Sequence, residues 1–281
     1  MFPRKIKLCD LFGIPVFLDF SLIILLLLFT TGGGDLVSGL LAACFLLLSI
    51  TAHELGHSLT ARCFGYETSD ITLSLLGGCA SLIALPRKAS QEFLTAIAGP
   101  AVSFLIAAAA LTWVGFLTVG SMWNFILYVV TNGFLGDSGL RCAPKFYGLV
   151  GLVDTLLNLG MMNLMLGLFN LLPGFPMDGG RVFRSAMRAF MDRARATYVA
   201  MIVGRVFAVL LAFHALARII NHGSWGFVTL LIAAMIWKEG YREYQQALME
   251  ASWGGRWDYS ARVSPPPYGG RWKETEVKKD R

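Results

Sequence analysis

Two histidines and a glutamate form one short motif inside an apolar segment of the chain. His53 and His57 are four residues apart, so on a helix both imidazoles project from the same face. Two imidazoles at this spacing can bind one zinc ion, and Glu54 between them can act as a base on water. The chain has only four histidines. Ionisable side chains in an apolar run are costly, so the motif predicts a functional site rather than a chance match.

Asp178 is the candidate for a third ligand. A catalytic zinc usually takes three protein ligands and keeps one position for water. Asp178 follows a segment broken by Pro173 and Pro176, and irregular backbone at membrane depth must be buried in protein or line a wet cavity. Asp178 could equally be the N-cap of a basic amphipathic helix at 181–195, where aspartate is favoured. The local sequence leaves both roles open.

Membrane-spanning elements must position these residues. Of the 281 residues, 56% are hydrophobic and only 15% are charged, whereas soluble domains carry about a quarter charged residues. The sequence therefore predicts an all-α polytopic membrane protein with about six transmembrane helices. We place them at about 14–31, 36–62, 92–118, 148–172, 198–219 and 225–238.

One short segment between the second and third spans is expected to form β structure. Residues 71–86 are too few to cross a bilayer as a helix, and their alternation around Gly77-Gly78 predicts a small membrane-embedded β-hairpin. Residues 119–147 are interpreted as a partly interfacial connector. We divide the chain into a transmembrane domain at 1–244, with its core at 36–190, and a mostly disordered cytoplasmic tail at 245–281.

Basic residues predict the orientation. The net charge of +6 comes from residues that flank apolar spans instead of forming one stripe, so nucleic acid is not expected as a partner. By the positive-inside rule both termini are cytoplasmic, with the cell (inner) membrane as the expected location. The residues on the cytoplasmic side include Arg4, Lys5, Lys7, Arg181, Arg184, Arg188, Arg193 and Arg195. Both the second and the fourth span then run inward and bring His57 and Asp178 to the same side.

The paired motifs resemble those of the site-2 protease family. His53 to His57 matches its HExxH motif, and residues 170–179 match its Asn-x-x-Pro-x-x-x-x-Asp-Gly pattern at every fixed position. Gly99-Pro100 is similar to the family's third-span signature, and Gly77-Gly78 to its membrane-embedded β region. The resemblance covers about residues 36–190. It implies an intramembrane zinc metalloprotease acting in regulated intramembrane proteolysis.

The resemblance also implies a role for each residue. His53, His57 and Asp178 would hold one zinc ion, and Glu54 would be the general base. Asn170 could donate a hydrogen bond to the substrate backbone or the oxyanion, or its amide could only satisfy the broken helix. An edge strand at Gly77-Gly78 could bind the unwound substrate, or the hairpin could be a re-entrant plug.

Two other functions are compatible with the residues. A metal-ion transporter could use the His/Asp cluster as a transit site, and a catalytically silent scaffold could retain it. The complete pair of motifs favours the protease, whose partners would be a membrane-protein substrate and the lipid bilayer. His214 stands alone in an apolar run, so we expect it to be hydrogen-bonded within the bundle rather than to bind metal.

Overall fold

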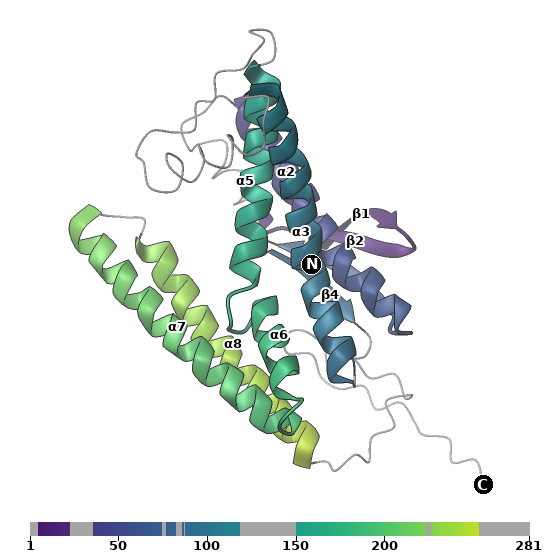
Figure 1. Cartoon of the computed structure of the whole chain (residues 1–281), viewed down its shortest axis with the longest axis vertical. Coiled ribbons are helices and arrows are strands. Elements are labelled where there is room, and N and C mark those ends of the chain that lie inside the picture. Colours follow the sequence, from purple (N-terminus) through teal and green to yellow (C-terminus); the bar gives the residue numbers. More distant parts are fainter. Residues whose placement is uncertain are drawn as a thin grey trace.

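The computed structural model describes residues 5–22, 36–74, 77–82, 86, 88–118, 150–222 and 226–252. Three long helices form its upright part (Figure 1): α2 (Leu36–Cys63), α3 (Ala89–Thr118) and α5 (Val150–Asn170). The backbones of α2 and α3 approach closely at Gly56, where an added Cβ would lie 2.8 Å from the Ala98 carbonyl oxygen. This close approach brings the two helices together beside the HExxH motif.

Four of the described helices are long and apolar enough to cross a membrane. They contain the segments Gly39–Cys63, Ala89–Leu117, Leu152–Asn170 and Arg193–Ile220. The chain is therefore an integral membrane protein, and four of the six predicted spans are confirmed as helices of sufficient length. The predicted sixth span lies in α8 (Gly226–Ser252), which is helical but is not among these four.

The prediction that the first span begins at residue 14 is wrong. Residues 14–19 form the strand β2 (Ile14–Asp19), which pairs with β1 (Lys5–Leu11). Ile14 and Val16 are fully buried, so the alternation typical of a strand is present but is hidden in a continuous apolar run. The remainder of the predicted span, at 23–31, lies outside the described residues.

The predicted hairpin is confirmed and belongs to a larger sheet. Strands β3 (Thr68–Ser74) and β4 (Gly77–Leu82) pair antiparallel, β2 and β3 pair parallel, and the strand order is β1-β2-β3-β4. The sheet packs on α2 through buried side chains, namely Ile14, Val16, Leu22, Ile50, Ile71 and Leu73. Strand β4 lies at the edge of the sheet next to α2, and its backbone faces the HExxH helix.

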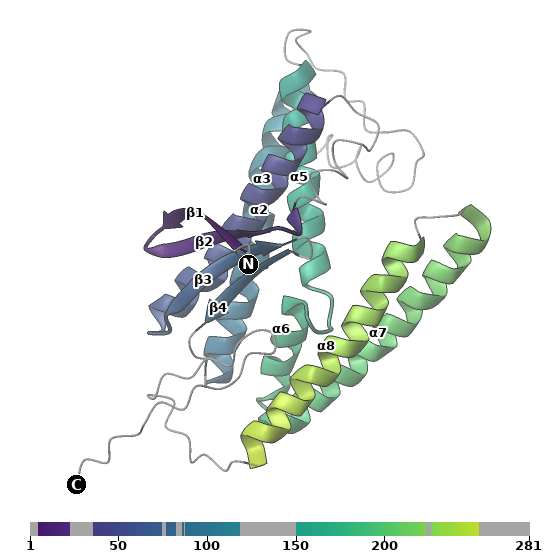
Figure 2. The same ribbon diagram turned by 180° about the vertical axis from the view of Figure 1, so that it is seen from behind.

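A short helix connects this body to a helical hairpin. Helix α6 (Asp178–Met187) lies between α3 and α7 (Arg193–His222), and α7 and α8 run antiparallel to each other (Figure 2). The predicted continuous helix at 181–195 is wrong, because α6 ends at Met187 and α7 begins at Arg193. Arg184 and Arg188 of this basic segment make buried ion pairs with Glu92, which the amphipathic pattern does not reveal.

Three further predictions concern the start of the tail, the place of His214 and the connector. Helix α8 continues past residue 244, where the tail was expected to begin, and ends at Ser252. His214 is exposed on α7, which contradicts its predicted place within the bundle. The whole of the expected connector at 119–147 and most of the expected tail lie outside the described residues.

Candidate metal centre

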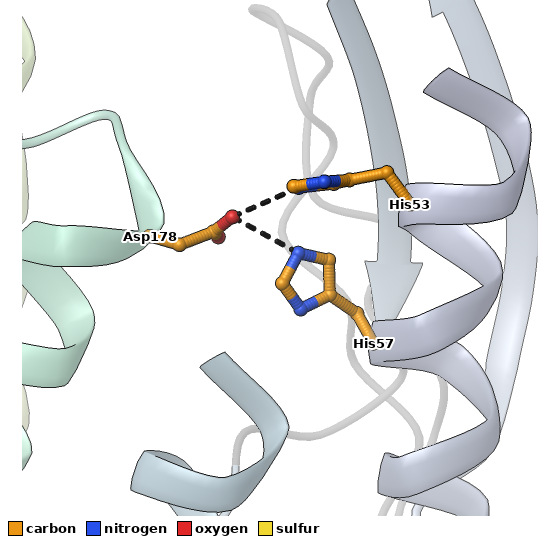
Figure 3. A group of neighbouring side chains, drawn as sticks. All are labelled: His53, His57 and Asp178. Carbon is orange, nitrogen blue, oxygen red and sulfur yellow. Dashed lines mark hydrogen bonds and ion pairs between the residues drawn. The ribbon is translucent and has the colours of Figure 1, made fainter. Parts of the chain in front are cut away.

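Three buried side chains converge where α2 meets the start of α6 (Figure 3). The Nε2 atoms of His53 and His57 lie 3.0 Å and 3.1 Å from Oδ2 of Asp178. One nitrogen or oxygen atom from each of the three residues lies within 4.8 Å of the others. The structure thus brings together the three residues that the sequence singled out, although Asp178 is more than 120 residues from either histidine.

The other nitrogen of each imidazole is held by α3. His57 Nδ1 lies 2.7 Å from the carbonyl oxygen of Thr95, which can only accept, so Nδ1 carries a proton and Nε2 is the nitrogen that faces Asp178. His53 Nδ1 lies 2.9 Å from the hydroxyl of Ser103. Such outer contacts fix the tautomer and orientation of metal-binding histidines. Sequence reasoning missed both partners, although each is within four residues of the Gly99-Pro100 pair.

Gly99 makes room for the imidazoles. A Cβ atom at this position would lie 2.5 Å from Cε1 of His57 and 2.7 Å from Nε2 of His53. Only a residue without a side chain lets α3 pass so close to both rings. The similarity of Gly99-Pro100 to a family signature therefore has a steric basis in this chain.

Asp178 reaches the site because the chain folds back tightly after α5. A Cβ at Gly180 would lie 2.8 Å from backbone atoms of Gly174 and Phe175, and one at Gly179 would collide with the carbonyls of the two residues that follow α5, Leu171 and Leu172. The N-cap of α6 is Met177, with no capping side chain, so the alternative role of Asp178 as N-cap is wrong. Burial opposes ionisation of Asp178, but the neighbouring His57 and hydrogen bonds from both imidazoles keep its pKa below the ordinary range.

Glu54 lies on the same helix and faces the sheet. Its Oε2 accepts a hydrogen bond of 3.0 Å from the backbone N–H of Ala80 in β4. A Cβ at Gly78 would collide with the Glu54 side chain and lie 2.8 Å from Cγ2 of Ile50. Gly78 therefore lets the edge strand lie directly against the carboxylate that the sequence predicts to be the base, whereas Gly77 is the first residue of β4, paired with Ser74.

Asn170 is engaged with its own helix. Its Nδ2 donates a hydrogen bond of 2.9 Å to the carbonyl of Leu166, four residues earlier. This contact agrees with the interpretation that the amide satisfies the end of α5. The amide is half-buried, and its oxygen keeps its capacity to accept.

The donor set suits zinc. Two imidazole nitrogens and one carboxylate oxygen are a common protein ligand set for a catalytic zinc ion. The described residues bring the three candidate ligands together, with Nδ1 of each imidazole held by a partner on α3 and no side chain at Gly99 to fill the space.

Comparison with known proteins decides the family. A model of peptidase family M50 matches residues 41–213, which include both histidines and Asp178. The chain belongs to peptidase family M50. A putative zinc metalloprotease from Synechocystis sp. is 33% identical to this M50 chain over 248 residues, 83% of this chain and 56% of the relative. A zinc metalloprotease from Methanocaldococcus jannaschii is 30% identical over 214 residues, 75% of this chain and 54% of the relative.

A solved structure agrees with this assignment. The site-2 protease from M. jannaschii matches with a TM-score of 0.57 at 26% identity, covering 85% of this M50 chain and 95% of that chain. The resemblance to the site-2 protease family is thus confirmed. The chain spans about half the length of the curated relatives it matches. Their names and the His-His-Asp cluster together fit a single Zn²⁺ as cofactor.

Proposed function

We propose that this M50 protein is an intramembrane zinc endopeptidase that cleaves a transmembrane or membrane-associated protein within or near the bilayer, in regulated intramembrane proteolysis. The observation that carries the proposal is the buried His53–His57–Asp178 cluster, with Glu54 in the same membrane-spanning helix. The comparisons do not favour metal transport.

Each residue of the cluster has a proposed role. His53, His57 and Asp178 hold the metal. When bound, zinc supplies Lewis-acid chemistry that acidifies water and polarises a peptide carbonyl. Glu54 accepts the proton of the attacking water and passes it to the leaving amine. The hydrogen bond from Ala80 holds the Glu54 carboxylate at the strand edge, so its proton transfers would occur next to β4.

The edge strand β4 is the proposed substrate-binding element. A helical substrate hides its peptide bonds, so a segment must unwind before it can be cleaved. The edge of β4 faces Glu54, and an unwound segment that adds to this edge would place its backbone beside the base. Gly77 and Gly78 have no side chains that would block the edge of the strand at this point. Asn170 would donate a hydrogen bond to the substrate backbone or the oxyanion once its hydrogen bond to Leu166 is released.

The charge distribution supports an orientation with both termini in the cytoplasm of a cell (inner) membrane protein. Helix α6 and the start of α7 carry arginines, and α2 has Arg62 in its last turn. The metal centre would then open toward the cytoplasmic half of the bilayer, where a released fragment is freed.

The test uses the Glu54→Gln variant, which keeps the shape of the side chain but cannot take a proton. Wild type and variant are reconstituted in liposomes with a candidate membrane substrate, and both peptide cleavage and metal flux are measured. We expect zinc content near that of wild type and cleavage reduced by about 10²–10⁴-fold. Full cleavage by the variant would remove Glu54 from its role, and metal flux in wild type without cleavage would favour the transporter.

A further inference from the structure

Arg184 is the largest fully buried side chain in the part of the chain that the structure describes. It lies on α6, six residues after Asp178. Its Nε donates a hydrogen bond of 2.8 Å to Glu92 of α3, and its Nη1 donates one of 2.8 Å to Glu243 of α8. A buried guanidinium is costly unless its partners compensate it, so this position depends on both carboxylates.

The first partner ties α6 to the helix face behind the metal centre. Glu92, Thr95 and Gly99 follow one another at spacings of three and four on α3, so they share one face. Thr95 accepts the hydrogen bond from His57, and Gly99 lies against both imidazoles. Arg188, the C-cap residue of α6, adds a second ion pair to Glu92, at 2.6 Å. These pairs set the position of α6 relative to the histidines.

The same guanidinium supports the loop that leads to Asp178. Its Cζ lies 4.9 Å from the centre of the Phe175 ring, and Phe175 is itself fully buried three residues before Asp178. Arg184 therefore contacts the segment on one side of Asp178 through Phe175, and it belongs to the helix on the other side. A shift of the Arg184 side chain would therefore move both the loop before Asp178 and helix α6.

The second partner belongs to the helical hairpin α7–α8. Among the described elements this hairpin packs chiefly on α6 and on the loop before it. Backbone meets backbone at Gly174 and Gly204, where a Cβ on either would lie 3.0–3.1 Å from the other's Cα. An apolar cluster completes the contact and consists of Met177, Ala208, Ala233 and Ile236. Helix α6 is thus the link between the hairpin and the helices that carry the histidines.

We propose that Arg184 is a positioning residue for the metal centre, which holds Asp178 against His53 and His57 only while α8 presents Glu243. Docking of the α7–α8 hairpin thereby sets the affinity for the metal. This inference rests on the ligand role proposed above for Asp178. It adds a coupling between the carboxyl-terminal hairpin and the zinc site that the motifs do not contain.

The charges of the cluster make the coupling sensitive to Glu243. Burial opposes ionisation of Glu243, but Arg184 beside it keeps its pKa below the ordinary range, so it is a carboxylate at neutral pH. Without that charge, Arg184 keeps only one of its two carboxylate partners, Glu92. Metal–ligand distances tolerate shifts of only about 0.2 Å, so a small rearrangement of α6 is enough to weaken the site.

The experiment measures release of zinc from the purified, zinc-loaded full chain to a coloured chelator. For Glu243→Gln we expect release about 10–100-fold faster than in wild type, the range typical of outer contacts to metal ligands. The matched control is Glu250→Gln, which removes a carboxylate of the same helix that pairs with Arg193 of α7 and not with α6. We expect the control to release zinc at the wild-type rate.

Wild-type release by Glu243→Gln would overturn the coupling, and so would equal acceleration by both variants, which would indicate general weakening of the hairpin. If Glu243→Gln does not fold, Glu243→Asp takes its place. This variant keeps the charge, but its side chain is one methylene too short to reach Arg184. Zinc release at the wild-type rate by Glu243→Asp would also overturn the coupling. Asp178→Ala separates the premises. If it keeps zinc, the ligand assignment fails; if it loses zinc while Glu243→Gln does not, only the coupling fails.

Discussion

Replacing Gly99 with alanine should damage the metal centre by steric exclusion alone. The new Cβ would lie 2.5 Å from Cε1 of His57 and 2.7 Å from Nε2 of His53, whereas nonbonded heavy atoms are comfortable at about 3.5–4.0 Å. The imidazoles or α3 must therefore move by about 1 Å. Metal–ligand distances tolerate only about 0.2 Å, so both histidines would leave the productive geometry.

The expected loss of zinc affinity is at least 10-fold, and each tenfold corresponds to about 1.4 kcal/mol. Overpacking itself costs about 1–3 kcal/mol of folding stability, so the assay must separate the two effects. Zinc affinity is measured by competition with a chelator. Folding stability is measured by thermal unfolding in the same detergent.

The matched control is Gly167→Ala. A Cβ there would lie 2.8 Å from Cε1 of Phe104, a clash of similar size between α5 and α3 that touches no residue of the metal centre. We expect Gly167→Ala to lose stability and retain zinc, and Gly99→Ala to lose zinc beyond any loss of stability. Wild-type zinc affinity in Gly99→Ala would refute the steric reasoning.

Three further predictions test the ligands, the edge strand and the orientation. His57→Ala should lose most of the zinc and Asp178→Ala should weaken its binding, as measured by metal analysis; unchanged zinc in the second would place the third ligand elsewhere. Ala80→Pro removes the edge N–H of β4 that donates to Glu54, so cleavage should fall while zinc stays bound, and normal cleavage would show that β4 is not needed to hold the base. Reporter fusions after Trp237 and within residues 135–145 should report opposite sides of the membrane, and the same side for both would reverse the inferred orientation.

The residues that approach the metal could be predicted because their chemistry is unusual for their surroundings. Histidines and a glutamate in an apolar helix have few explanations, and the glycines and prolines around Asp178 indicate a break in the fourth span. Residues that support them carry no such signal. Ser103 and the Thr95 carbonyl are ordinary features of an apolar helix, and their role appears only once α3 is placed against α2.

The errors in the predicted fold have a common cause. Strand β2 lies in an apolar run long enough to suggest a helix, and its period of two is visible only when the buried residues are known. The arginines after Asp178 suggest a basic surface, because their partners Glu92 and Glu243 are far away in the sequence. In both cases long-range contacts override the local pattern.

The parallel pairing of β2 with β3 has a consequence for how the protein can move. Helix α2 lies in the crossover between these two strands, so the HExxH motif and the sheet belong to one unit, which is continuous along the chain and closed by the hydrogen bonds between β2 and β3. Asp178 comes from outside that unit. A zinc ion held by all three side chains would therefore link two parts of the chain, the unit that contains α2 and the sheet, and helix α6. By thermodynamic reciprocity, metal binding must tighten the attachment of α6 by the same factor by which that attachment tightens the metal.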